Sequence, residues 1–244
     1  MIGVIGGNGV AATNKLCQLI EEKVTRNGAY RDAHHPEMVI WQATQAPSRS
    51  MYLEGRGPSW IEDYVDIGKK LKECGCTRLC MCCNTAHYAI DELEEKIGLP
   101  FINLLLLVAR ECNKKGMKRI GMMCSDGLRL VRLYDKQFEA INPDIELVYP
   151  DEEYQKLVTL GICNSKNKIR FENALKSEDH PYNCFLKVCK HLQNDKNVDG
   201  IVSGCTDINN VFSTLNLNED EDIKLNIIDS LDVLAEEIVH YNNN

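Results

Sequence analysis

Short apolar runs alternate along the chain with longer stretches whose apolar positions recur with a helical period. In the first half the strand-length runs cover 1–7, 37–43, 77–83 and 100–105. The helical patterns between and after them cover 11–25, 60–75, 85–98 and 106–116. This alternation is typical of a parallel α/β fold, because parallel strands are buried on both faces and are joined by helical crossovers.

The pattern restarts near residue 118. An Ile-Gly pair again lies inside an apolar run that ends at a glycine turn, and a helical pattern follows over 128–141. Further strand-length runs cover 145–150 and 198–204, with helices through about residue 192 between them. The final strand and helix patterns, over 224–241, are expected to return together to the first half.

The two halves have similar order and spacing, which suggests an internal duplication. Gly3 and Cys83 are 80 residues apart, and Gly121 and Cys205 are 84 apart. We therefore predict two similar parallel-sheet, flavodoxin-like α/β domains related by a pseudo-twofold axis, with the active site in the cleft between them. The first domain is expected to cover 1–102 plus about 222–244, and the second 103–221.

Composition limits the function classes. Hydrophobic residues make up 44% of the 244 residues and charged residues 26%, as in ordinary soluble proteins. The net charge of −8 argues against nucleic-acid and membrane partners, and the longest apolar run, 101–109, is too short to span a bilayer. Because the N-terminus lacks the pattern of a secretion signal, we expect the twelve cysteines to be reduced and the protein to be cytoplasmic.

Two cysteines stand where a predicted strand gives way to a helix: Cys83 in "CMCCNTAHY" and Cys205 in "GIVSGCTDI". Ligands of parallel α/β folds bind at the carboxyl ends of strands, where backbone N–H groups and helix dipoles favour a thiolate and a substrate carboxylate. If the halves face each other, one thiolate can remove a proton from a carbon while the other thiol delivers a proton to the opposite face. That is acid–base catalysis without a metal or an organic cofactor.

Other interpretations of the cysteines stay open. Either one alone could be a buried structural residue. The run Cys74, Cys76, Cys80, Cys82, Cys83 invites a zinc site, but its i, i+2 spacings suit one face of a strand better than the paired ligands of structural zinc. Cys80 and Cys82 are expected to lie in the core.

Two further signals are weaker. His87 follows Cys83 by one helical turn and is expected either to orient that thiol or to hydrogen-bond the other half. The turn "GGNGVAA", with Asp32 further on, matches a dinucleotide-binding fingerprint. Because Asp32 does not end a second strand, we favour glycines that bring backbone N–H groups close to a substrate carboxylate.

Taken together, the motifs resemble the aspartate/glutamate racemase family nearly from end to end. "IGVIGGNG" followed by "AT", "DAHHP" and "TQAPSR" resemble its first landmarks, "CNTAHY" and "GCTD" its two catalytic motifs, and "SDG" and "IIDS" also fit. The resemblance, closest to aspartate racemase, implies an amino-acid racemase independent of pyridoxal phosphate (PLP), with Cys83 and Cys205 as catalytic acid and base and no cofactor or metal. It also implies a small acidic amino acid as partner and a homodimer.

The resemblance further implies a set of substrate-binding residues: Arg49, Asn84, Thr85, Thr206, Asn8, Gly9 and Lys166. A guanidinium suits Arg49 to this role because its fork pairs bidentately with a carboxylate. The family's usual lysine aligns with Asn167, which Lys166 and Lys168 straddle.

Three positions depart from the family pattern. Asn8 replaces the usual methionine, Val10 the usual proline, and Asp207 the glutamate that usually follows "GCT". None of these changes removes the pair of thiols. We expect racemisation of aspartate first and glutamate second. The alternatives are a cis–trans isomerase of an unsaturated diacid, a hydantoin or arylmalonate enzyme, or a catalytically silent binding protein for acidic amino acids.

Overall fold

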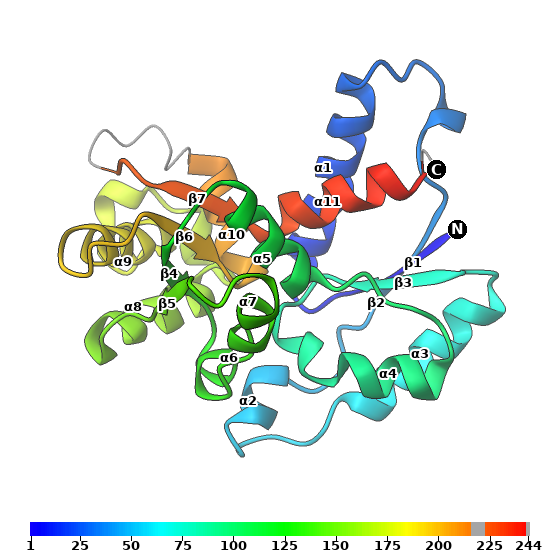
Figure 1. The fold of residues 1–244 in the computed structure, drawn as a ribbon, viewed down its shortest axis with the longest axis horizontal. Helices are drawn as coiled ribbons and strands as arrows, with labels where there is room; N and C mark the ends of the chain where they lie inside the picture. Colours follow the sequence, from blue (N-terminus) through cyan, green and yellow to red (C-terminus); the bar gives the residue numbers. More distant parts are fainter. Residues whose placement is uncertain (216–222, 243–244) are drawn as a thin grey trace. The chain divides into compact units, whose positions relative to one another are not determined.

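The computed structural model describes residues 1–215 and 223–242 and divides the chain into two compact units. Unit 1 comprises Met1–Leu107 and Leu231–Asn244, and unit 2 comprises Val108–Ser230. Each unit is built around its own parallel sheet (Figure 1). The predicted α/β class with two parallel sheets is confirmed.

The sheet of unit 1 has the strand order β2-β1-β3. Its strands are β1 (Ile2–Gly6), β2 (Met38–Gln42) and β3 (Arg78–Met81). All of β1 is buried, which explains its unbroken apolar sequence. The helical elements are α1 (Val10–Arg26), η1 (Asp32–His34), α2 (Arg49–Leu53), α3 (Ile61–Glu73), η2 (Thr85–Ala89), α4 (Ile90–Ile97) and α11 (Ser230–Asn242). Helices α3 and α4 pack against each other beside the sheet (Figure 1).

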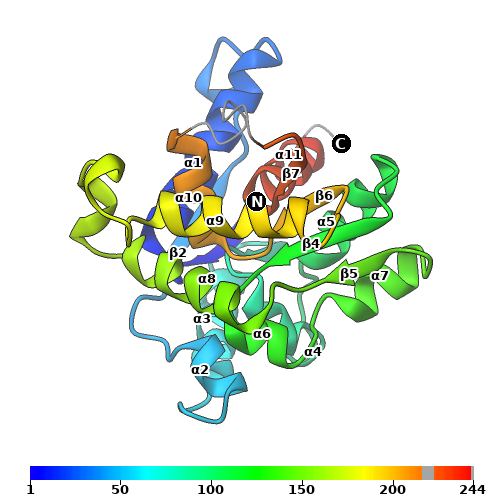
Figure 2. The ribbon, with the colours of Figure 1, turned by 90° about the vertical axis from the view of Figure 1, so that its left-hand side faces the viewer.

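The sheet of unit 2 has the order β5-β4-β6-β7. Its strands are β4 (Arg119–Met123), β5 (Glu146–Val148), β6 (Gly200–Ser203) and β7 (Asn226–Asp229). Its helical elements are α5 (Leu104–Lys114), α6 (Asp126–Leu130), α7 (Asp135–Ile141), α8 (Glu152–Asn164), η3 (Lys168–Phe171), η4 (Ala174–Lys176), α9 (Pro181–Asn194) and α10 (Thr206–Leu215). Helices α8 and α9 lie side by side along one face (Figure 2).

The strand register matches the two units residue by residue. Gly3 of β1 pairs with Leu79 of β3, and Gly121 of β4 pairs with Ile201 of β6. In both sheets the strand that carries the glycine also pairs with the next strand of the chain, β2 or β5. A common order and a common register are what the predicted duplication requires.

Two predicted elements differ from the structure. The expected strand over 100–105 is reduced to one parallel bridge between Leu79 and Phe101, because the Asn103 side chain accepts the Leu106 N–H at 3.0 Å and α5 starts at once. The expected helix over 128–141 is divided into α6 and α7 by Arg132, whose φ is +48°.

The last strand was expected to return to the first domain with the last helix, and this is wrong for the strand. Strand β7 pairs with β6 inside unit 2, where Ile227 lies opposite Ile201. Strand β6 is completely buried and therefore needs a hydrogen-bonded neighbour on each side. Only the helix that follows belongs to unit 1.

Helices α5 and α11 are exchanged reciprocally between the units. Helix α5 follows the bridge of unit 1 but belongs to unit 2 from Val108 onward, whereas α11 follows the last strand of unit 2 and belongs to unit 1 from Leu231 onward. Lys23 of α1 holds α11 through ion pairs with Asp232 at 2.9 Å and Glu236 at 3.0 Å. The chain therefore crosses between the units twice, once in each of these helices.

Candidate active site

Cys83 and Cys205 occupy equivalent positions in the two units. Leu79 of β3 pairs with Gly3, and Cys83 lies four residues after Leu79. In the same way Ile201 of β6 pairs with Gly121, and Cys205 lies four residues after Ile201. In both turns the backbone N–H three residues further on donates to the cysteine carbonyl, at 3.2 Å for Cys83 and 3.0 Å for Cys205. Neither cysteine is in a disulfide and both are half-buried, so they combine access with partial desolvation.

Most of the other ten cysteines lie in a different environment. Seven of them are buried, Cys74 and Cys163 are exposed, and only Cys17 is half-buried like Cys83 and Cys205. Burial raises the pKa of Cys82 to about 12 and that of Cys112 to about 12, so a thiolate is disfavoured there. Cys80 and Cys82 are completely buried, which confirms their predicted place in the core. Within the described ranges, no group of three or more His, Cys, Asp or Glu side chains is placed to hold a metal ion.

The buried imidazole of His87 connects the Cys83 turn to the start of α5. Its Nδ1 lies 2.9 Å from the Cys83 carbonyl oxygen, and the Leu104 N–H donates to Nε2 at 3.1 Å. A carbonyl only accepts and a backbone N–H only donates, so we assign a neutral ring with its proton on Nδ1. Burial lowers the pKa of His87 to about 4, in agreement with a neutral ring. Neither ring nitrogen makes the expected bond to the other half.

Asn8 lies in the glycine turn that follows β1. Gly7 and Gly9 have φ values of +79° and +130°, which side-chain-bearing residues rarely adopt. Asn8 is only 7% exposed, and neither atom of its amide has a hydrogen-bond partner. Leaving a buried polar group unsatisfied costs on the order of 1–3 kcal/mol, so this amide calls for a functional explanation.

Asn84 and Thr85 follow Cys83 directly, and both are buried. The turn that Thr85 begins is the 3₁₀ helix η2, and the side chain of Asn84, at φ −57° and ψ −45°, makes no capping hydrogen bond. Binding of a substrate carboxylate by Asn84 and Thr85 stays a prediction.

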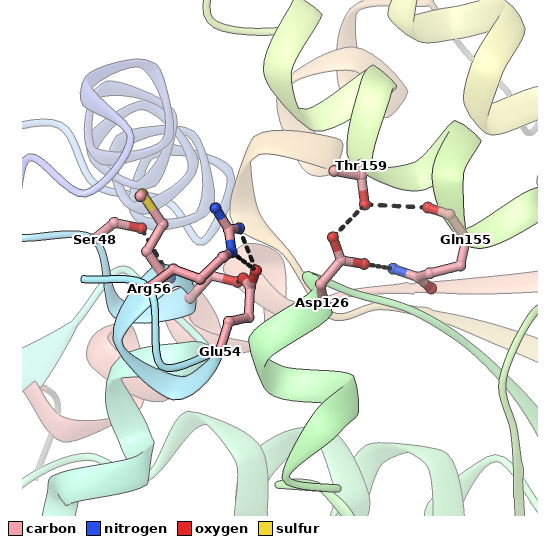
Figure 3. Close-up of polar contacts among 8 residues, drawn as sticks. Ser48, Glu54, Arg56, Asp126, Gln155 and Thr159 are labelled. Carbon is pink, nitrogen blue, oxygen red and sulfur yellow. Dashed lines mark hydrogen bonds and ion pairs between the residues drawn. The ribbon is translucent and has the colours of Figure 1, made fainter. Parts of the chain in front are cut away.

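Arg49 is the first residue of α2. Its Nη1 donates to the Pro47 carbonyl at 2.7 Å and to the Ala46 carbonyl at 3.4 Å, so the guanidinium braces its own loop. The helix is capped by Ser48, whose hydroxyl accepts the Met51 N–H at 3.3 Å. Figure 3 shows this short helix and the Glu54–Arg56 ion pair that follows it.

The hydroxyl of Tyr64 marks a buried region near both Arg49 and Cys83. Burial raises the pKa of Tyr64, while the Arg49 charge opposes that rise and the Cys83 and Cys82 thiols add to it. Cys83 packs against the core cluster that contains Tyr64, so this hydroxyl lies near the first thiol. The Tyr64 hydroxyl itself is buried without a hydrogen-bond partner.

In unit 2 a lysine and a carboxylate lie next to the second thiol. Lys166 Nζ lies 2.9 Å from Asp207 Oδ2, and the Cys205 Sγ lies 4.0 Å from the same oxygen. Asp207 is 4% exposed and lies in the first turn of α10, where the helix dipole favours a negative charge. Thr206, which begins α10, is also buried.

The loop after α8 contains Lys166, Asn167 and Lys168, around the position where the family usually has a lysine, and the three side chains make different contacts. Both lysines are exposed, but Lys166 pairs with Asp207, whereas Lys168 begins η3. The Asn167 side chain accepts the Ile169 N–H at 2.8 Å and donates to Asn164 at 3.0 Å, which commits it to the loop.

Asp126 lies five residues after Gly121, the position that corresponds to Asn8 in unit 1. Its carboxylate accepts from Gln155 Nε2 at 2.8 Å and from the Thr159 hydroxyl at 2.8 Å (Figure 3). Both donors lie on α8, the helix that leads to Lys166. The corresponding positions therefore have opposite roles, since Asp126 is satisfied internally and Asn8 is not.

The comparisons with known proteins extend over nearly the whole chain. The sequence model of the Asp/Glu/Hydantoin racemase family matches residues 2–238. The chain belongs to this family. It is therefore an isomerase enzyme of the racemase class, as the motifs predicted.

Individual relatives are distant in sequence. A broad specificity amino-acid racemase, RacX of Bacillus subtilis (strain 168), is 21% identical over 98% of this chain and 96% of its own length. The fold is similar to that of Picrophilus torridus aspartate racemase, with a TM-score of 0.77, 23% identity, and coverage of 99% of this chain and 94% of that one. An aspartate racemase homologue from Pyrococcus horikoshii OT3 has a TM-score of 0.73, 18% identity, and coverage of 100% and 99%.

Some contacts of this family member were not anticipated from its sequence. In the sequence Asp207 is only a departure from the family pattern, whereas in the structure it pairs with Lys166 next to Cys205. The "SDG" motif gives no sign of the contacts of Asp126, and a tyrosine in a helical pattern, such as Tyr64, gives no local signal of its neighbours. The described part of the chain contains no helix that is both long and apolar enough to cross a membrane.

Proposed function

We propose that this enzyme racemises an acidic amino acid by two-base proton transfer between Cys83 and Cys205, without a cofactor. The observation that carries the proposal is the equivalent register of the two half-buried thiols, one per unit. Inversion at Cα requires a base on one face and an acid on the other, and on this proposal each unit contributes one of the two thiols.

In this mechanism one cysteine acts as a thiolate and removes the proton from Cα. The electron pair left on Cα is delocalised into the α-carboxylate. The other cysteine, as a thiol, donates its proton to the opposite face and becomes the thiolate. One proton is lost and one is gained, the configuration is inverted, and the reverse reaction exchanges the two roles.

The remaining residues support the binding of a substrate with two carboxylates. On this proposal Arg49, with Asn84, Thr85 and the backbone of the Gly9 turn, binds one carboxylate, and Asn8 adds its unsatisfied amide. Lys166 and Thr206 bind the other near Cys205, where Asp207 steadies the lysine. Cations and N–H donors beside the reacting carboxylate stabilise the charge that develops there.

The substrate class rests on these cations and on the relatives. Aspartate racemases among proteins of the same fold support aspartate, and the broad specificity of the B. subtilis relative supports testing a wider set of amino acids. A panel should therefore include L- and D-aspartate, glutamate, alanine, an unsaturated diacid and a hydantoin.

The decisive experiment follows the α-proton. We expect the purified protein, without added PLP, to exchange the α-proton of L-aspartate in D₂O and to abolish its optical rotation. Cys83→Ser and Cys205→Ser should each lower the rate of racemisation at least about a thousandfold, since racemisation needs both thiols. Full activity in either variant would disprove the two-base mechanism. Tight aspartate binding in calorimetry without exchange would indicate a silent binding protein instead.

We also propose a cytoplasmic homodimer. Most of the cysteines are buried in the cores as small apolar residues, which supports a reducing compartment. The edge strand β2 exposes Ile40 and Trp41, each 39% accessible, and apolar residues at a sheet edge support association of two copies. Light scattering of the purified protein at micromolar concentration tests the dimer.

A further inference from the structure

A side chain four residues after each cysteine bonds to the first residue of an exchanged helix. In unit 1, His87 follows Cys83 by four residues and accepts the Leu104 N–H at 3.1 Å. In unit 2 the residue four after Cys205 is Asn209, whose Nδ2 donates to the Ser230 hydroxyl at 3.1 Å. Leu104 begins α5 and Ser230 begins α11.

The two helix starts are themselves equivalent. Leu104 lies three residues after Phe101, which bridges to Leu79, and Ser230 lies three residues after Ile227, which pairs with Ile201. Both connections therefore join the same pair of positions in the duplicated fold, although one uses an imidazole and the other an amide. Retention of a bond through different side chains argues for the connection itself rather than for a particular residue.

Each connection also lies at a crossing between the units. Leu104 stands three residues before the crossing at Leu107–Val108, and Ser230 is the last residue of unit 2 before α11 joins unit 1. His87 and Asn209 are both buried, at 3% and 0% exposure, so the bonds are shielded from competition with water.

We propose that His87 and Asn209 are paired positioning residues, each of which holds one cysteine turn against the crossing helix that begins beside it. This inference rests on the proposed function, because it takes Cys83 and Cys205 as the acid and base. His87 acts through the Cys83 carbonyl and Leu104, and Asn209 acts through Ser230. Neither side chain transfers a proton to the substrate.

Thiol-resolved alkylation tests the proposal without relying on turnover. Iodoacetamide labelling, followed peptide by peptide with mass spectrometry, reports every cysteine in one sample. We expect His87→Ala to raise the labelling rate of Cys83 about fivefold and leave that of Cys205 unchanged, and Asn209→Ala to do the reverse, since loss of one hydrogen bond changes an equilibrium by about that factor. Exposed Cys74 is the reference for the reagent, and buried Cys80 reports unfolding.

Matched substitutions at His87 separate its two bonds. The glutamine amide reaches the place of Nε2, and the asparagine amide reaches the place of Nδ1. If the Leu104 bond holds the turn, His87→Gln should restore the Cys83 labelling rate and the kcat, while His87→Asn should leave kcat about tenfold low with KM little changed. If Cys80 is also labelled in His87→Ala, that variant is partly unfolded, and the comparison of His87→Gln with His87→Asn is then the test.

Equal effects of each variant on both thiols, or no effect on either, would overturn the proposal. Selective effects on labelling in a protein that racemises no substrate would uphold the two connections and refute the proposed function. If the cysteine variants lose racemisation but the His87 and Asn209 variants label both thiols at the wild-type rate, the proposed function is supported and the positioning role is refuted.

Discussion

Asp207 Oδ2 lies 2.9 Å from Lys166 Nζ, although the two residues are separated by α9 and β6 in the chain. The carboxylate is buried and the lysine side chain is 53% exposed, so the anchored partner is the acid. In unit 1 the position equivalent to Asp207 is Thr85, two residues after its cysteine. The charge pair is thus a feature of the second thiol alone.

Asp207→Asn should therefore weaken substrate binding more than it affects the folding of unit 2. The change removes the charge of the Lys166 partner, so the lysine is held less firmly, and we expect KM for aspartate to rise about tenfold, which corresponds to roughly 1.4 kcal/mol. Steady-state kinetics with both enantiomers measures the change. Asp207→Glu, which restores the residue usual in the family, is the matched control and should retain most of the affinity. An unchanged KM in Asp207→Asn would contradict a binding role for the pair.

Asn8 should show a conflict between stability and function. Asn8→Leu replaces an unsatisfied buried amide with a nearly isosteric apolar side chain, so we expect the free energy of unfolding to rise by about 1 kcal/mol. The same change removes the donor and acceptor proposed for the substrate, so KM should rise about tenfold. Urea unfolding and kinetics on the same preparation test both effects, and a less stable variant would refute this explanation of Asn8.

Neighbouring cysteines provide an internal control for the mechanism. Cys82→Ala removes a completely buried thiol and should cost about 1 kcal/mol of stability while most of the activity remains. Cys83→Ala removes a half-buried thiol and should abolish racemisation with little loss of stability. Thermal melting and proton exchange in D₂O distinguish the two. The mechanism fails if Cys82→Ala is inactive and Cys83→Ala is active.

The buried His87 predicts a specific dependence of stability on pH. Its pKa in the folded protein is about 4, lowered from 6.5 by burial, so the unfolded chain binds an extra proton between these values. Stability is therefore complete above pH 6.5 and falls as the pH drops toward 4, by about 3 kcal/mol in total from this one group. Denaturant titrations at several pH values between 4 and 7 give the free energy of unfolding of the wild type and of His87→Gln. This free energy should depend less on pH in the variant. An equal dependence on pH in both proteins would contradict a neutral buried ring.

The sequence by itself determined the α/β class, the order of most strands and helices, and the two cysteines at strand ends. These features follow from local periodicity and from motifs of a few residues. Apolar runs predicted β1 and β6 because both strands are buried on two faces, and "CNTAHY" and "GCTD" located Cys83 and Cys205 before any contact was known.

Only the tertiary structure decided the partners of these elements. It paired β7 with β6, exchanged α5 and α11 between the units, selected Lys166 rather than Lys168 beside Asp207, and left the amide of Asn8 unsatisfied. The physical reason is the same in each case. Strand neighbours, ion pairs and the satisfaction of buried polar groups depend on which distant residues share a small volume, and no local pattern in the chain encodes that proximity.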